Sequence, residues 1–89
     1  MIEEKVDIIN KLGLHARAAA KLSHLANSFA SDIYLTYNGD SVNAKSLLGI
    51  LTLAASVGTS LGVRVNGRDE EKAMVALRDL FARRFDEES

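Results

Sequence analysis

The sequence predicts a two-layer α/β sandwich, in which helices cover one face of a sheet of four short strands. Segments with alternating apolar and polar residues are interspersed along the chain with segments whose apolar residues have helical spacing. Two of the alternating segments flank Asn38-Gly39, which is typical of a tight hairpin because both residues tolerate positive φ. With 89 residues, 47% apolar and 26% charged, the composition indicates one small globular domain, residues 1–89.

The first half of the chain contains three expected strands and one helix. Residues 2–9 alternate between apolar and charged side chains, which predicts a half-buried strand. Apolar residues then recur at helical spacing from Ala16 to about Phe29. Strands are expected at 33–37 and 41–43, on either side of the hairpin turn.

The second half is expected to contain two helices and the fourth strand. Ser46 opens a short leucine-rich helix, and residues 61–65 alternate as a strand. Asp69 is the expected N-cap of the last helix, and the acidic tail 86–89 is expected to fray. The buried face of the last helix should consist of apolar residues at helical spacing: Ala73, Leu77, Leu80, Phe81 and Phe85.

The counts of charged residues and cysteines exclude several classes of function. Eleven basic residues against twelve acidic ones give a net charge of -1, which argues against nucleic acid or an anionic membrane as a partner. The absence of cysteine excludes disulfide scaffolds, thiol catalysis and cysteine-based zinc sites. No apolar run approaches the roughly 20 residues of a membrane span, so we expect a cytoplasmic protein without membrane insertion.

His15 is the strongest candidate for chemistry, because it lies directly before the expected helix. The start of a helix offers unpaired backbone N–H groups and a partial positive charge, which attract anions. Arg17 adds a planar cation suited to phosphate oxygens. An imidazole there can attack a phosphoryl group, and the site can hold the resulting dianion. The alternative is that His15 only caps the helix and Arg17 is a solvated surface charge.

Metal binding is not expected. His15 and His24 would lie on nearly opposite faces of one helix, at about 100° per residue, and no thiol is available as a further ligand. We therefore predict neither a metal nor a cofactor. His24 is interpreted as a polar residue on the solvent face of the helix.

Two segments resemble the HPr family, the histidine-containing phosphocarriers of the bacterial sugar phosphotransferase system. Residues 10–22, NKLGLHARAAAKL, resemble the active-site segment of that family. Residues 42–55, VNAKSLLGILTLAA, are similar to its regulatory-serine segment. One departure is Ala18, where many members carry proline; alanine keeps its backbone N–H and remains a good helix former.

The resemblance implies a fold, a reaction and partners. The fold would be an open-faced βαββαβα sandwich, with an antiparallel sheet of order 1-4-2-3 and three helices on one face. Phosphate would pass from phosphoenolpyruvate through enzyme I to Nδ1 of His15, and then to an enzyme IIA domain. Arg17 would stabilise the phosphate, and Ser46 would be the target of an HPr kinase/phosphorylase. The protein would be a monomeric carrier and not an enzyme.

A partner surface is expected beside His15. One short helix has more leucines than it can bury, so part of them should form an exposed docking patch ringed by basic residues, Arg17, Lys21 and Lys45. The expected partner-binding residues are Ala16, Ala20, His24, Leu47, Leu48 and Leu51.

Two further functions compete with that of a carrier in sugar transport. A mainly regulatory member of the family would signal to a kinase or a transcription factor, and the sequence does not separate this role from transport. A structural domain without phosphochemistry is disfavoured, because His15 and Arg17 serve no packing need.

Overall fold

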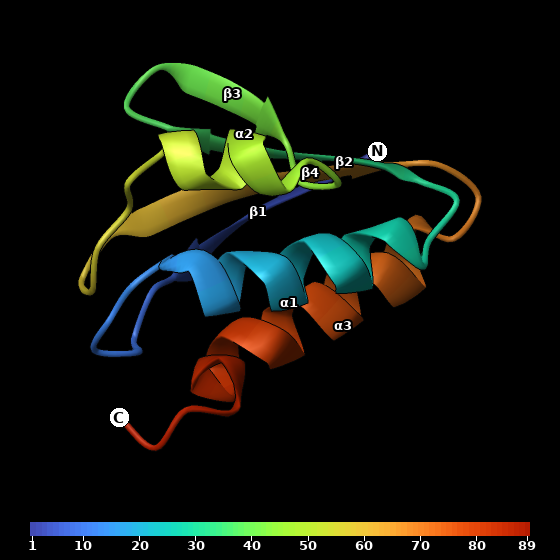
Figure 1. The fold of residues 1–89 in the computed structure, drawn as a ribbon. Coiled ribbons are helices and arrows are strands. Elements are labelled where there is room, and N and C mark those ends of the chain that lie inside the picture. The colour runs from blue at the N-terminus through green and yellow to red at the C-terminus, as the bar shows by residue number, and fades with distance from the viewer.

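A computed structural model of residues 1–89 shows a four-stranded antiparallel sheet with three helices on one face (Figure 1). The strands are β1 (Ile2–Asp7), β2 (Asp32–Tyr37), β3 (Asp40–Asn43) and β4 (Ser60–Asn66). The helices are α1 (Ala16–Asn27), α2 (Leu47–Thr52) and α3 (Glu70–Ala82), followed by the single turn η1 (Arg84–Asp86). The predicted fold class and strand order are confirmed.

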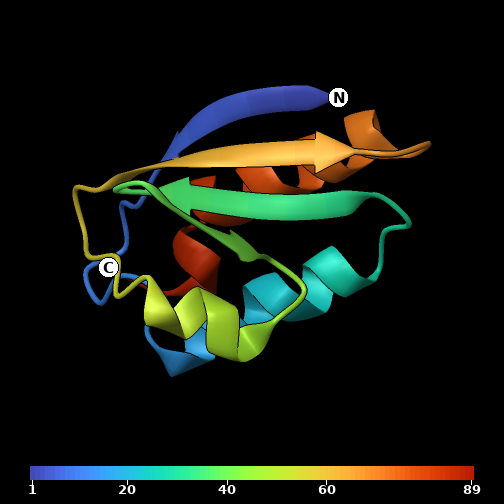
Figure 2. The same cartoon turned by 90° about the horizontal axis from the view of Figure 1, so that it is seen from above.

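The sheet has the order β1-β4-β2-β3, as Figure 2 shows from one edge to the other. Central strand β4 pairs with both neighbours, so that Val63 lies opposite Glu4 of β1 and opposite Leu35 of β2. The hairpin between β2 and β3 turns at Asn38 and Gly39, whose φ values of 56° and 86° are both positive, as the sequence predicts.

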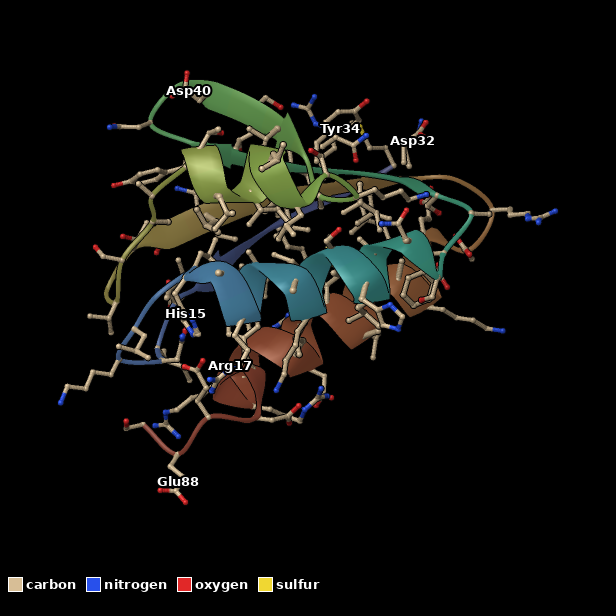
Figure 3. All side chains as sticks on the ribbon, in the orientation of Figure 1. His15, Arg17, Asp32, Tyr34, Asp40 and Glu88 are labelled. Atoms are coloured by element: carbon tan, nitrogen blue, oxygen red, sulfur yellow. The ribbon has the colours of Figure 1, made fainter.

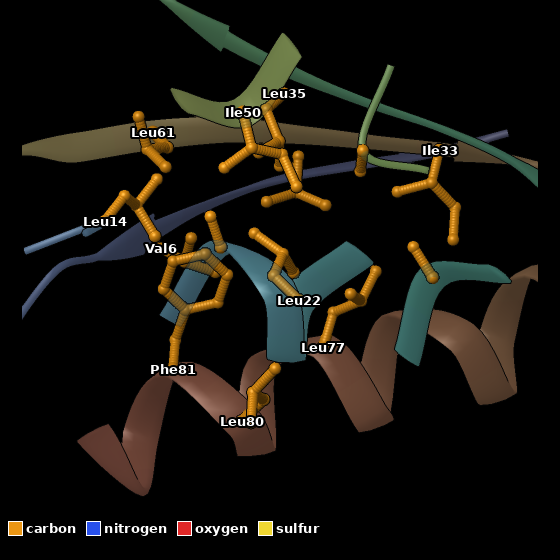
Figure 4. Packing of buried hydrophobic residues seen from close by; sticks show 14 of the residues in the cluster. Val6, Leu14, Leu22, Ile33, Leu35, Ile50, Leu61, Leu77, Leu80 and Phe81 are labelled. Atoms are coloured by element: carbon orange, nitrogen blue, oxygen red, sulfur yellow. The ribbon is translucent and has the colours of Figure 1, made fainter. Parts of the chain in front are cut away.

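The core lies between the sheet and the helices α1 and α3 (Figure 4). Leu22 of α1 and Leu77 of α3 are fully buried, and they face Leu35 and Leu61 of the sheet. Burying a leucine side chain stabilises a fold by about 1.5–3 kcal/mol, so this layer accounts for the arrangement of the two long helices. The two helices run antiparallel to each other along the sheet, which brings the start of α1 close to the end of α3.

The predicted role of Asp69 is wrong in part. Asp69 does precede α3, but its carboxylate makes no cap hydrogen bond. The carboxylate accepts hydrogen bonds from the backbone N–H groups of Ala30 and Ser31, at 2.8 and 2.9 Å, and from the Ser31 hydroxyl. These bonds, that of the Ser31 side chain above all, lower the pKa of Asp69 to about 2. Asp69 therefore joins the loop after α1 to the start of α3.

We expect Asp69 to make folding stability depend on pH. Since its folded-state pKa lies below the ordinary value of 3.8, the ionised carboxyl stabilises the fold above about pH 4, and this contribution is lost as the pH falls toward 2. Thermal unfolding between pH 6 and pH 2 should show a smaller decrease in Tm for Asp69→Asn than for the wild type. Asp32→Asn, at an exposed position of β2, is the matched control. Parallel curves for the wild type and Asp69→Asn would contradict this role.

The end of the chain also differs from the prediction. Helix α3 ends at Ala82, and three consecutive residues, Arg84, Phe85 and Asp86, have φ values of 56°, 55° and 64°. This left-handed turn reverses the chain and buries Phe85, whose ring centroid lies 5.0 Å from that of Phe81. Phe85 is thus buried as expected, but outside the helix. The tail that follows returns toward the start of α1 and makes specific contacts there, so the expectation that it frays is wrong.

Candidate functional site

The loop before α1 is fixed by Gly13 and Leu14. Gly13 has a φ of 67°, and a Cβ atom there would lie 2.6 Å from the carbonyl oxygen of Ala55. The N–H of Leu14 donates to the same oxygen at 3.0 Å, and the Leu14 side chain is buried. Only glycine satisfies both the left-handed conformation and the close approach. This contact determines where the next residue, His15, leaves the loop and enters the helix.

His15 occupies the N-cap position of α1 with an extended backbone, but its side chain makes no cap hydrogen bond. The interpretation of His15 as a simple helix cap is therefore wrong. The first turn of α1 carries no acidic residue, so no side chain of that turn neutralises the positive end of the helix. Ala18, which stands where many family members have proline, is fully buried in the first turn of α1, and the helix forms there normally.

The imidazole of His15 is instead held by the C-terminal tail. Its Nε2 atom pairs with one carboxylate oxygen of Glu87, whose other oxygen accepts a hydrogen bond of 3.0 Å from Nδ2 of Asn10. Burial opposes the ionised form of Glu87, but the hydrogen bonds from Asn10 and His15 and the charge of Arg17 outweigh it, and the pKa of this carboxyl is lowered. Sequence analysis missed the roles of Asn10 and Glu87, because Glu87 lies 72 residues after His15 and no local pattern joins the two.

Two lysines attach the tail to the rest of the molecule. Nζ of Lys21 donates to the carbonyl oxygen of Phe85 at 2.8 Å and lies 3.7 Å from the carboxylate of Asp86. The backbone N–H of Lys11 donates to the carbonyl oxygen of Ser89 at 3.0 Å. These contacts place the tail against the loop before α1 and the first two turns of that helix.

Arg17 is exposed beside this tail and takes part in none of the ion pairs within the chain. Together with Lys21 and residues 86–89 it lines a surface pocket of about 310 Å³. Figure 3 shows His15, Arg17 and Glu88 at the same end of the molecule. The guanidinium is thus available to an anion that approaches His15.

The residues expected to bind partners are mostly exposed. Leu47 and Leu48 are 40% and 75% exposed, whereas Leu51 is half-buried and packs against the core. Ala16, Ala20 and His24 are exposed on α1. Helix α2, which carries the leucines, lies against α1.

The expected basic ring around the leucines is not formed as predicted. Nζ of Lys45 donates to the carbonyl oxygen of Phe29, beyond the C-terminal end of α1, at 2.8 Å. Nζ of Lys21 is bound to the tail, as described above. Of the three cations, only Arg17 is free of hydrogen bonds to the rest of the chain. The reason is that lysine side chains are long enough to reach the carbonyl groups left unpaired where helices end.

Fold and site together define a class of protein: small α/β sandwiches in which a histidine, an arginine without an ion pair and the N-terminus of a helix share one surface. The chain belongs to the HPr family, the phosphocarrier proteins of the phosphotransferase system, since residues 2–83 match the family described as "PTS HPr component phosphorylation site". It thus has the role of a phosphocarrier in that system.

Curated proteins and solved structures agree with this assignment. The chain is 49% identical over 89 residues to "Phosphocarrier protein HPr" of Xylella fastidiosa, with 100% of both chains covered. The crystal structure of HPr-C-His from Thermoanaerobacter tengcongensis is similar with a TM-score of 0.96 and 43% identity, again over 100% of both chains. An HPr dimer from the same organism is similar with a TM-score of 0.79 and 42% identity, over 98% of this chain and 100% of that one.

Proposed function

We propose that the protein accepts a phosphoryl group from phosphorylated enzyme I on Nδ1 of His15 and passes it to an enzyme IIA domain. The observation that carries this proposal is the orientation of the His15 ring, whose Nε2 is occupied by Glu87 while Nδ1 makes no hydrogen bond within the chain. Nδ1 of His15 therefore lies at the N-terminus of α1, where Arg17 makes no ion pair within the chain. The protein is a substrate of its partners and not itself an enzyme.

The transfer follows from the groups present. The lone pair on Nδ1 attacks phosphorus, and the bond between phosphorus and the donor breaks with its electron pair remaining on the donor. The new phosphoryl dianion is stabilised by the backbone N–H groups of the first turn of α1 and by the guanidinium of Arg17. Because these groups hold the dianion without enclosing it, the next acceptor can remove it by the reverse chemistry.

Incubation with phosphoenolpyruvate, enzyme I and Mg²⁺ tests the proposal. We expect the intact mass to increase by one phosphoryl group and the label to be lost in acid, because a phosphorus–nitrogen bond hydrolyses when the ring is protonated. An unchanged mass, or an acid-stable label, would contradict the proposed function.

Arg17 should contribute to transfer and not to folding. Removing one charge-assisted hydrogen bond costs about 1.5–3 kcal/mol, so Arg17→Ala should slow phosphorylation by enzyme I at least about tenfold. Its circular dichroism spectrum should match that of the wild type, because the side chain is exposed. Arg68→Ala, at an exposed arginine before α3, is the matched control and should keep the normal rate. Equal rates for all three proteins would show that backbone N–H groups suffice.

Ser46 is proposed as a regulatory phosphorylation site for an HPr kinase/phosphorylase. Ser46 is exposed at the start of α2. Its Oγ accepts a hydrogen bond of 3.0 Å from the N–H of Gly49, which confirms that Ser46 is the N-cap of this helix, as expected. Leu47 and Leu48 follow directly and are proposed as docking residues for partner proteins. A kinase that reaches Ser46 would therefore also modify the partner surface.

The setting of the reaction belongs to the same proposal. None of the helices combines the length and the apolar character that a membrane span requires. We place the carrier in the cytoplasm, where phosphoenolpyruvate is available, and propose that it acts there as a monomer. One similar structure is that of an HPr dimer, but the site described above draws all of its groups from a single chain.

A further inference from the structure

We infer that Glu87 and Asn10 are positioning residues, which together fix the tautomer of His15 that leaves Nδ1 as the nucleophile. The inference rests on the proposed function, because it explains which nitrogen of His15 reacts. It concerns a chain of three side chains, Asn10, Glu87 and His15, that joins the loop after β1 to the tail and to the start of α1.

Asn10 determines how the carboxylate of Glu87 is used. Asn10 is fully buried, and its Nδ2 donates to the carbonyl oxygen of Gly13 at 2.8 Å and to Oε1 of Glu87 at 3.0 Å. The orientation of this amide is unambiguous, since its oxygen would be repelled by both of these acceptors. With Oε1 engaged by Asn10, Oε2 is the oxygen directed at His15.

The carboxylate in turn determines the protonation of the ring. An ionised carboxylate only accepts hydrogen bonds, and the lowered pKa of Glu87 keeps it ionised at neutral pH. A neutral His15 must therefore carry its proton on Nε2 to bind Oε2, and the lone pair remains on Nδ1. The same logic operates wherever a carboxylate orients a histidine for catalysis or for metal binding.

The tail is built to hold Glu87 in this place. Residues that are not glycine adopt left-handed conformations only at a cost, yet three of them do so in succession immediately before Glu87. The buried ring of Phe85 and the hydrogen bond from Lys21 to its carbonyl oxygen retain this turn. The side chain of Glu87 is only 12% exposed and that of His15 25%, so solvent competes little for their hydrogen bond.

Glu87→Gln provides a sharp test, because an amide has one acceptor oxygen where the site requires two. Asn10 should draw that oxygen toward itself and turn the NH₂ group toward Nε2 of His15. The ring would then carry its proton on Nδ1, the reverse of the wild type. Long-range ¹H–¹⁵N spectra of protein labelled at histidine, recorded at about pH 9 where an imidazole is neutral, report this tautomer directly.

Phosphorylation kinetics give a second readout. Loss of a hydrogen bond to a charged group corresponds to about a tenfold effect or more, so kcat of enzyme I for Glu87→Gln should decrease about tenfold while KM stays unchanged. Glu71→Gln makes the same chemical change at an exposed glutamate in the first turn of α3 and should alter neither tautomer nor kcat. Adding Asn10→Ala to Glu87→Gln removes the competing donor, and it should restore the wild-type tautomer.

The outcomes separate this inference from the proposed function. A wild-type ring protonated on Nδ1, or a tautomer that Glu87→Gln leaves unchanged, would overturn the roles of Glu87 and Asn10 even if His15 is phosphorylated normally. A wild-type protein that enzyme I does not phosphorylate on His15 would overturn the proposed function, whatever the tautomer. The tautomer spectra of the wild type and of Glu87→Gln require neither phosphorylation nor the double variant. They therefore decide the inference even if the double variant fails to fold.

Discussion

His15→Ala should abolish acid-labile phosphorylation from phosphoenolpyruvate and enzyme I. The attacking lone pair belongs to this imidazole alone, since the other histidine, His24, lies far along α1 on an exposed face. The variant should stay folded, with a free energy of unfolding lowered by at most about 1.5–3 kcal/mol, because the His15 side chain is partly exposed, makes no cap hydrogen bond and loses only its bond to Glu87. Intact-mass spectrometry and thermal unfolding measure the two effects.

His24→Ala is the matched control for His15→Ala. It removes the same side chain from the same helix and should leave labelling complete. Label that persists in His15→Ala, with the variant folded, would move the site elsewhere and remove the basis of the proposed reaction. Loss of label in both variants would mean that enzyme I docking, and not the nucleophile, is affected.

Phosphorylation of Ser46 should slow phosphorylation of His15 by about ten- to a hundredfold, the size expected of like charges brought together at an interface. Oγ of Ser23 on α1 donates to the carbonyl oxygen of Lys45 at 3.0 Å, which places the start of α2 beside α1 about two turns from His15. Eight residues of helix correspond to about 12 Å, so a partner surface that covers His15 also reaches Ser46, and docking brings the two like charges within the Debye length of about 8–10 Å. A dianion there would repel an acidic partner surface that has been built to receive Arg17.

Ser46→Asp should imitate this effect more weakly. Aspartate is as good an N-cap as serine, so the variant should melt near the wild type but accept phosphate from enzyme I more slowly, and the defect should shrink as salt is added. Ser41→Asp, which adds the same charge at an exposed position on the edge strand β3, should have little effect. A defect that salt does not change, or a variant that melts far below the wild type, would indicate lost capping or altered packing instead of repulsion.

Much of the fold was predictable because its signals are local. The alternation of apolar and polar residues in β4 and the Asn38-Gly39 turn can each be recognised from consecutive residues, and the structure contains both. The contacts of Asp69 and Phe85 could not be predicted from neighbouring residues, because they depend on tertiary packing. An aspartate before a helix resembles an N-cap in any sequence, and only the packed loop shows that it binds Ser31 instead. The left-handed turn around Phe85 contains no glycine that would indicate it in the sequence, and only tertiary packing stabilises it.

The candidate site was predictable to the extent that it lies within one segment. His15 is the N-cap of α1 and Arg17 lies in its first turn, and their chemistry follows from the start of a helix. Glu87 and Asn10 do not follow from it, because a carboxylate near a chain end is usually solvated and a buried asparagine has no periodic signature. Glu87 meets both His15 and Asn10 only because α1 and α3 lie side by side and the turn after α3 returns the chain to the start of α1.

The most direct test of the account is to identify the atom that carries phosphorus. Protein labelled with ¹⁵N at histidine and phosphorylated by enzyme I should show ³¹P–¹⁵N coupling to Nδ1 of His15 and to no other nitrogen, and the signal should disappear when an enzyme IIA acceptor is added. Coupling to Nε2 of His15, or to either nitrogen of His24, would contradict the account.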